Sequence, residues 1–179
     1  MVKIFKIFCV FSFVIILSAC NLTTCETKTA PQPKQSDNIN VFFTPGTKCE
    51  TNIIKNINKS NKIDIVVYSI TNPAIVDSIL AAHTRGASIR VITDRTQSKG
   101  KGSLVGKIRS AGIPVATNIK HKIEHNKFGI FDDRYVVTGS YNWTTNASYY
   151  NSENCVFFDQ LEGMEYSKRF EYLWQLYNN

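Results

Sequence analysis

The sequence is poor in residues that could bind metal ions or form disulfides, with five cysteines and three histidines among 179 residues. No two cysteines have the spacing of zinc ligands, which argues against a structural zinc site. Beyond the first 20 residues only Cys25, Cys49 and Cys155 remain. In an oxidising compartment they allow at most one intrachain disulfide, and the sequence does not choose the pair. The chain also lacks internal repeats, and its length allows one buried core, so we expect a single folded domain.

Long hydrophobic runs are also missing. The N-terminal apolar stretch, in MVKIFKIFCVFSFVIILSAC, is too short and ends too abruptly for a typical membrane span. It follows Lys3 and Lys6 and ends in Leu-Ser-Ala-Cys, an order that resembles a bacterial lipoprotein signal. We therefore expect residues 1–19 to be a signal peptide and Cys20 to be the lipidated first residue of the mature protein. An ordinary signal peptide or an uncleaved anchor is the alternative, and in each case the chain leaves the cytoplasm.

Residues 20–38 lack apolar periodicity and contain Pro31 and Pro33, so we expect a lipidated flexible tether ahead of a folded domain at 39–179. The resulting prediction is an exported, membrane-anchored bacterial lipoprotein on the periplasmic or cell-surface side. Asn21 is not the aspartate that marks inner-membrane retention in enterobacterial-type sorting. The outer membrane is therefore the expected location if the cell is Gram-negative.

Acidic residues are outnumbered, since 14 Asp and Glu face 21 Lys and Arg and give a formal net charge of +7. Removing the two lysines of the signal still leaves 19 basic side chains. The excess therefore belongs to the mature protein, and it favours a polyanionic partner such as nucleic acid or anionic lipid.

Part of the positive charge lies in the stretch RTQSKGKGS, where Arg95, Lys99 and Lys101 accompany Gly100 and Gly102. This composition predicts a mobile basic loop. Its functional interpretation is contact with a phosphate backbone. A merely solvated loop is the alternative.

From Ile39 onward, segments with strand and helix periodicity alternate. Asn72 can cap a helix that has Pro73 at its first position and stops at Gly86. Because strands outnumber helices toward the C-terminus, we expect a mixed β-sheet with helices on both faces, which is an α/β fold. The expected strands span 41–46, 63–69, 88–93, 113–117, 125–131, 134–139 and 154–158. The expected helices include 53–57, 73–86, 103–111 and 164–177.

The stretch HKIEHNKFGIFDDRYVVTGSYNW, residues 121–143, carries most of the candidate chemistry. On a strand, His125 and Lys127 share one face and Asp132 lies on the other, because side chains alternate with period two. His125 and Lys127 are therefore expected to act together. We expect Asp132 to make a structural ion pair or a loop hydrogen bond rather than to touch substrate.

Ser140 and Asn142 follow a strand that ends at Gly139, where a tight bend can expose side chains. An imidazole, an ammonium, an amide and a hydroxyl that converge on one spot suit a phosphoryl group, since they supply a nucleophile, a positive charge and hydrogen-bond donors. Glu153 precedes the next strand, where it could accept the other ring proton of His125 and orient the ring. For Ser140, a role in the bend alone is the alternative.

Six of these residues have a characteristic spacing, which is His125-x-Lys127-x4-Asp132-x6-Gly139-Ser140-x-Asn142. The pattern resembles the HKD motif of the phospholipase D superfamily. The similarity extends from about Val41 to Leu176, and the short chain with a single motif resembles the bacterial Nuc-type endonucleases of that superfamily. The resemblance implies a phospholipase D-like sandwich and phosphodiester hydrolysis without a metal or another cofactor.

A single motif leaves one chemical role unfilled. Cleavage of a phosphodiester through a phosphohistidine needs one imidazole to attack phosphorus and another to protonate the leaving oxygen. His121 lies four residues before His125, roughly 13 Å away along a strand, and His83 is expected in a helix. A two-fold homodimer would bring His125 from each subunit to one axis, and the family resemblance implies the same arrangement.

Three functions fit these features. The favoured one is an endonuclease acting on DNA or RNA, whose backbone the basic loop would follow. The alternative is a phospholipase D acting on membrane phospholipid, against which stands the lack of an obvious exposed apolar segment beyond the signal. The third is a lipoprotein that only binds DNA, which the presence of His125, Lys127 and Asn142 disfavours.

Overall fold

The computed structural model describes residues 39–159 and 165–179. The predicted signal peptide, Cys20, the tether and Cys25 lie outside these ranges. The described strands form one seven-stranded sheet in the order β1-β7-β6-β5-β2-β3-β4. Their bounds are β1 Asn40–Phe43, β2 Lys62–Val67, β3 Ser88–Thr93, β4 Val115–Thr117, β5 Lys127–Phe131, β6 Tyr135–Gly139 and β7 Asn154–Asp159.

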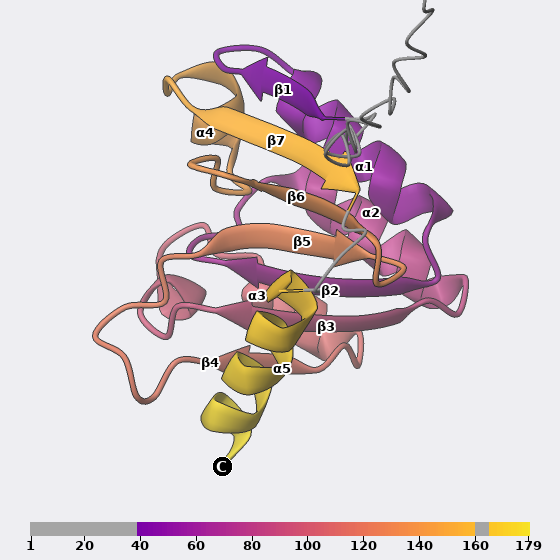
Figure 1. Ribbon diagram of the computed structural model, residues 1–179. Coiled ribbons are helices and arrows are strands. Elements are labelled where there is room, and N and C mark those ends of the chain that lie inside the picture. The colour runs from indigo at the N-terminus through magenta and orange to yellow at the C-terminus, as the bar shows by residue number, and fades with distance from the viewer. Residues whose placement is uncertain (1–38, 160–164) are drawn as a thin grey trace, which may run out of the picture. The chain divides into compact units, whose positions relative to one another are not determined.

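The sheet is mixed, as predicted, and helices flank both of its faces (Figure 1). Strands β2, β3 and β4 run parallel, whereas all other neighbours pair antiparallel. Helices α1 (Lys48–Lys59), α2 (Pro73–Thr84), α3 (Val105–Ser110) and α4 (Thr145–Tyr149) pack on one face, and α5 (Glu165–Asn178) packs on the other. The predicted α/β class is confirmed.

Helix α2 makes the crossover between the parallel strands β2 and β3, and its ends follow the sequence signals. The Asn72 Oδ1 atom accepts hydrogen bonds from the backbone N–H groups of Ala74 and Ile75, at 2.9 and 3.3 Å. These bonds satisfy two donors that the first turn of a helix leaves free. Gly86 follows the helix with a φ of 97°, a conformation that favours glycine.

A disulfide joins Cys49 in α1 to Cys155 in β7, across 106 positions of sequence, and both cysteines are buried. The sequence left this pair open because spacing does not say which elements meet. The pairing of β1 with β7 and the packing of α1 beside β1 bring the two cysteines together. The short helix α4 was not predicted, since five residues are too few to show periodicity. The sequence signal for α4 was Thr144 at its N-cap, whose Oγ1 accepts a 3.1 Å hydrogen bond from the N–H of Ala147.

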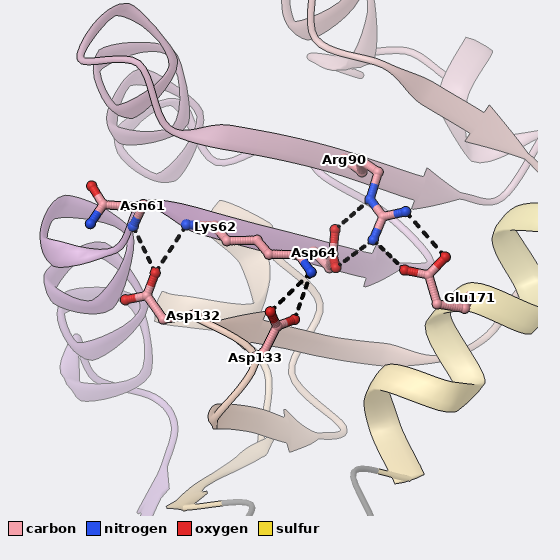
Figure 2. Close-up of polar contacts among 7 residues, drawn as sticks. All are labelled: Asn61, Lys62, Asp64, Arg90, Asp132, Asp133 and Glu171. Carbon is pink, nitrogen blue, oxygen red and sulfur yellow. Dashed lines mark hydrogen bonds and ion pairs between the residues drawn. The ribbon is translucent and has the colours of Figure 1, made fainter.

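An ion-pair cluster holds α5 against the sheet (Figure 2). The Arg90 guanidinium donates two 2.8 Å bonds to Asp64 and bonds of 2.6 and 3.2 Å to Glu171, and it lies 4.6 Å from the Phe170 ring centroid. Hydrogen bonding to Arg90 lowers the pKa of the more exposed Glu171, whereas burial raises the pKa of Asp64 despite the same partner. With α5 fixed in this way, Tyr177 near its end reaches the loop before β5.

Candidate active site

One edge of the sheet collects the residues predicted to act in chemistry. The parallel strands β2, β3 and β4 end at this edge and β5 begins there, because Val67 at the end of β2 pairs with Lys127 at the start of β5. Strand β6 ends and β7 begins at the same edge, where Gly139 pairs with Cys155. The segments that leave this edge carry His125, Ser140, Asn142 and Glu153.

Side chains alternate along β5 as the sequence predicted. Phe131 belongs to the core under α1 and α2, and Phe128 belongs to the core under α5. Lys127 shares the face of Phe131, and its Nζ donates a 2.6 Å hydrogen bond to the backbone carbonyl of His125. His125 lies just before β5 rather than inside it, and its side chain is exposed.

The Lys127 ammonium is poorly solvated, because only 8% of the residue is exposed. Burial lowers the pKa of Lys127, and the negative charges of Glu153 and Glu124 act in the opposite direction. No salt bridge within the described ranges pairs Lys127 with a carboxylate. A buried cation without a close counter-ion gains stability when an anion binds beside it.

The predicted hydrogen bond between His125 and Glu153 is absent among the described residues. The Glu153 Oε1 atom accepts a 3.0 Å bond from the Asn151 side chain, and the Glu153 N–H donates to Thr44 Oγ1 at 2.9 Å. The glutamate is therefore held by its own turn, which the sequence could not indicate. The ring of His125 instead packs against Tyr68, with ring centroids 4.7 Å apart.

Reciprocal hydrogen bonds build the bend after β6. Ser140 N–H donates to Asn154 Oδ1 at 2.9 Å, and Asn154 N–H donates to Ser140 Oγ at 3.1 Å. Gly139 has a φ of 144°, and a Cβ atom there would collide with the Asn154 backbone, so the position requires glycine. The Oδ1 atom of Asn142 is buried and has no hydrogen-bond partner among the described residues. Orphaned acceptors of this kind are rare, so Asn142 differs from Ser140 and Asn154, whose side-chain oxygens both accept hydrogen bonds within the bend.

The two other histidines have different surroundings. His121 Nδ1 lies 2.6 Å from Tyr177 Oη, which donates a 2.7 Å bond to Glu124 Oε2. Because the Tyr177 hydroxyl donates its proton to Glu124, its oxygen can only accept from His121, so His121 Nδ1 is the donor of the 2.6 Å bond. His83 lies in the last turn of α2. No group of three or more His, Cys, Asp or Glu within the described ranges could hold a metal ion.

The family described as "Cardiolipin synthase, PLD-like domain" matches residues 53–174, more than half of the chain. The chain belongs to the phospholipase D superfamily. Within it, the mitochondrial cardiolipin hydrolase of Xenopus tropicalis is 36% identical over 117 residues, which cover 65% of this chain and 56% of that protein. The phospholipase D of Rickettsia prowazekii (strain Madrid E) is 32% identical over 120 residues, covering 66% of this chain and 58% of that one. The chain thus spans little more than half the length of these curated relatives.

Two solved structures are matched over nearly their whole length. The phospholipase D family member Nuc from Salmonella typhimurium has a TM-score of 0.72 at 28% identity, covering 78% of this chain and 95% of Nuc. NucT from Helicobacter pylori has a TM-score of 0.70 at 24% identity, covering 77% of this chain and 96% of NucT, and shows the fold alone. The predicted phospholipase D-like sandwich is confirmed, and the chain is of the Nuc type with a single HKD motif.

The aspartate of the HKD motif lies at the opposite end of β5 from His125. Asp132 Oδ1 accepts hydrogen bonds from the backbone N–H groups of Asn61 and Lys62, at 2.8 and 3.0 Å (Figure 2). These bonds tie the β5–β6 turn to the start of β2. They are loop hydrogen bonds of the type expected for Asp132.

The basic loop after β3 contains local hydrogen bonds that the glycine-rich sequence did not predict. The buried Asp94 Oδ1 accepts hydrogen bonds from the N–H groups of Thr96 and Gln97, at 2.9 and 3.0 Å, and residues 97–99 form a 3-10 turn. Three side chains of the loop are exposed and make no ion pair with any described residue, namely Arg95, Lys99 and Lys101.

A buried hydrogen-bond network beneath the bend was not predicted. Glu50 Oε2 accepts bonds from Asn72 Nδ2 at 2.6 Å and from Ser148 Oγ at 2.8 Å, and Ser148 Oγ lies 2.6 Å from Tyr141 Oη. Burial raises the pKa of Tyr141 to about 12, so the phenol keeps its proton. Tyr141 directly precedes Asn142, so the network anchors the turn that carries the amide. Its members are far apart in sequence, and only Tyr141 lies within the motif.

Proposed function

We propose that this protein is a metal-independent phosphodiesterase that hydrolyses nucleic acid as an endonuclease, through a phosphohistidine on His125 in a site shared by a homodimer. The observation that carries the proposal is the position of the buried Lys127 ammonium, bonded to the His125 backbone at the edge where the Asn142 turn also lies. These groups can bind and attack one phosphodiester without a bound metal.

The proposed reaction has two steps. In the first, an imidazole nitrogen of His125 attacks phosphorus and forms a P–N bond, while the P–O bond to the leaving alcohol breaks. A second imidazole gives its proton to the leaving oxygen. Lys127 and Asn142 hold the non-bridging oxygens, where negative charge accumulates. In the second step water attacks phosphorus and gives a proton to the second imidazole, and the P–N bond breaks to restore His125.

In this proposal the second imidazole is His125 of the other subunit. The ring of His125 is exposed and has no hydrogen bond among the described residues, so it is accessible to a partner. His121, by contrast, is already engaged with Tyr177. An isologous interface beside His125 would bring two identical rings to one phosphorus.

Subunit mixing tests the shared site. When active dimers exchange with an excess of His125→Ala chains, a mixed dimer has an attacking group or a proton donor but not both. Activity should then fall as the square of the wild-type fraction. Light scattering first establishes that subunits exchange. The control is wild-type protein mixed with Tyr135→Leu chains, because mixed dimers with this variant keep both His125 rings. A linear fall would contradict the dimeric site and direct attention to His121 as the second acid.

Nucleic acid is the preferred substrate class because of the charge around the site. The basic loop leaves the same sheet edge as His125, and its Arg95, Lys99 and Lys101 are unpaired within the described ranges. A phosphate backbone offers a row of anions for such side chains. The match, which covers 95% of Nuc, supports the same choice, because the resemblance to Nuc-type endonucleases implies a nucleic-acid substrate.

Hydrolysis of a membrane phospholipid is the second candidate, and one observation favours it. Ile119 and Ile123, in the loop before His125, are each 49% exposed, and Lys120 and Lys122 beside them are also exposed. This corrects the sequence-based expectation that no exposed apolar segment exists beyond the signal. Apolar side chains between lysines suit the surface of an anionic bilayer. The relatives named cardiolipin hydrolase and phospholipase D support this candidate.

A substrate panel decides between the two candidates. Full-length protein is assayed in EDTA on single-stranded DNA, double-stranded DNA, RNA, and vesicles of phosphatidylcholine with and without anionic lipid. We expect nucleic acid to be cleaved, and the His125→Asn control to be inactive on every substrate. A protein with Ile119→Ser and Ile123→Ser should cleave nucleic acid at the wild-type rate. If the wild type cleaved the vesicles but no nucleic acid, and the double variant no longer cleaved the vesicles, the phospholipase proposal would replace the nuclease proposal.

We also propose that the protein is exported and anchored to a membrane through lipid on Cys20. The support is the basic, apolar and small-residue order of residues 1–19, which precede the described part of the chain. Within the described part, no helix has the length and apolar character to cross a membrane. Metabolic labelling with a radioactive fatty acid should mark the wild-type protein and not a Cys20→Ser variant.

A further inference from the structure

Tyr68 touches both residues on which the proposed reaction depends most. It follows directly after β2, and its ring centroid lies 4.7 Å from that of His125, with an interplanar angle of 61°. The Nζ atom of Lys127 lies 5.3 Å from the centroid of the same tyrosine ring. One aromatic side chain therefore contacts the proposed nucleophile and the proposed phosphate-binding ammonium.

Tyr68 is itself held by three hydrogen bonds. Its N–H donates to the Asn126 carbonyl at 3.0 Å, and its carbonyl accepts from Thr93 Oγ1 at 3.3 Å. Its Oη accepts a 3.1 Å bond from the side chain of Gln97. Gln97 belongs to the basic loop, whose backbone is bonded to the buried Asp94. The tyrosine ring is thus fixed at its backbone and at its hydroxyl.

His125 and Lys127 have few other contacts that could hold them. No described residue makes a hydrogen bond to the His125 ring, and the Lys127 ammonium is bonded to the His125 carbonyl rather than to a carboxylate. An edge-to-face aromatic contact restricts the rotation of an imidazole. The negative face of an aromatic ring attracts an ammonium group and favours its charged form.

We infer that Tyr68 is a positioning residue, which orients the His125 ring for attack and holds the Lys127 ammonium in place and in its charged form. The catalytic meaning of this inference rests on the proposed function. Its physical content, the contact between the Tyr68 ring and Lys127, can be measured without substrate. The other charged groups that act on Lys127 are Glu124 and Glu153, and a substitution at Tyr68 leaves both in the chain.

The test is an NMR titration of Lys127 in full-length protein labelled at lysine Cε, with Lys127→Arg used to identify the signal. Tyr68→Leu keeps apolar bulk but removes the aromatic face, so it should lower the pKa of Lys127 by about half a unit. Tyr68→Phe keeps the face and should leave that pKa unchanged. The control is Tyr135→Leu, which removes a ring that lies 4.7 Å from Lys59 Nζ at the far end of β6. This control should not move the Lys127 signal.

Kinetics on a cleavable phosphodiester give the second readout. Tyr68→Leu should lower kcat about tenfold or more while KM changes by less than about threefold, because orientation is lost and the binding groups remain. The basic limb of its pH profile should move to lower pH, since less of Lys127 is charged at a given pH. Tyr68→Phe should keep the wild-type basic limb. A merely structural role for the ring would leave the basic limb unshifted in both variants.

A third variant covers the case in which Tyr68→Leu does not fold. Pentafluorophenylalanine at position 68 keeps the shape of the ring and reverses its quadrupole, so the Lys127 signal should shift in the same direction. An unchanged Lys127 titration in a folded variant would overturn the inference. Inactivity of the wild-type protein on every phosphodiester would refute the proposed function instead, and the titration would still report on the contact.

Discussion

Replacement of Asp132 separates the structural part of the HKD motif from its chemical part. Asp132→Ala removes the acceptor of the two bonds from Asn61 and Lys62 and places alanine at a φ of 51° (Figure 2). Each lost bond should cost about 1 kcal/mol, because water can replace it at this exposed turn. The left-handed conformation adds about 1 kcal/mol for alanine. We therefore expect a loss of about 3 kcal/mol in the free energy of unfolding.

For a folded part of this size, that loss corresponds to a fall in melting temperature of about 8 °C. Circular dichroism measures the transition, and kcat is measured well below it, where Asp132→Ala should retain wild-type turnover. Asp132→Asn is the matched control, since it keeps an Oδ1 acceptor and tolerates positive φ, and it should lose less than about 1 kcal/mol. If Asp132→Ala kept its melting temperature and lost more than about 100-fold in kcat, the carboxylate would have to act in the reaction.

Three further predictions follow from charges and cross-links. Changing Lys99 and Lys101 to alanine should reduce the slope of log affinity for nucleic acid against log salt by about two units, and an unchanged slope would leave the loop as solvated surface. Changing Cys49 and Cys155 to serine should lower the free energy of unfolding by about 3 kcal/mol, measured by urea denaturation. The hydrogen bond from Arg90 lowers the pKa of Glu171 in the folded state. The ion pair therefore stabilises the fold at pH values above the pKa that Glu171 has in the unfolded chain, and this stabilisation is lost as pH falls through the lower pKa of the folded state. The melting temperature of the wild type should therefore fall further on acidification than that of Glu171→Gln.

The secondary structure was predictable wherever local signals agreed. Strand β3 has the predicted bounds, and the Asn72 cap and Pro73 begin α2 where expected. Period-two alternation correctly put Lys127 and Phe131 on one face of β5. The start of β5 was predicted two residues too early, because His125 continues the extended pattern in sequence but lies outside the ladder.

The rest of the site depends on contacts between distant segments, which periodicity does not encode. Glu50 and Ser148 are 98 residues apart, yet their bond supports the turn that carries Asn142. Glu153 was expected to bond His125, but the nearer Asn151 holds its carboxylate. Tyr68 appeared in sequence only as one aromatic residue at the end of a strand. Its position against His125 follows from the pairing of β2 with β5.

One assay tests directly whether His125 cleaves phosphodiesters without a metal, and it does not presume the natural substrate. Hydrolysis of bis(p-nitrophenyl) phosphate is followed in EDTA for wild-type protein and for His125→Asn, with equal folding verified by circular dichroism. We expect turnover by the wild type in EDTA and a loss of about 1,000-fold or more in the variant. Activity of His125→Asn within about tenfold of wild type, or wild-type activity that vanishes in EDTA and returns with a divalent ion, would contradict it.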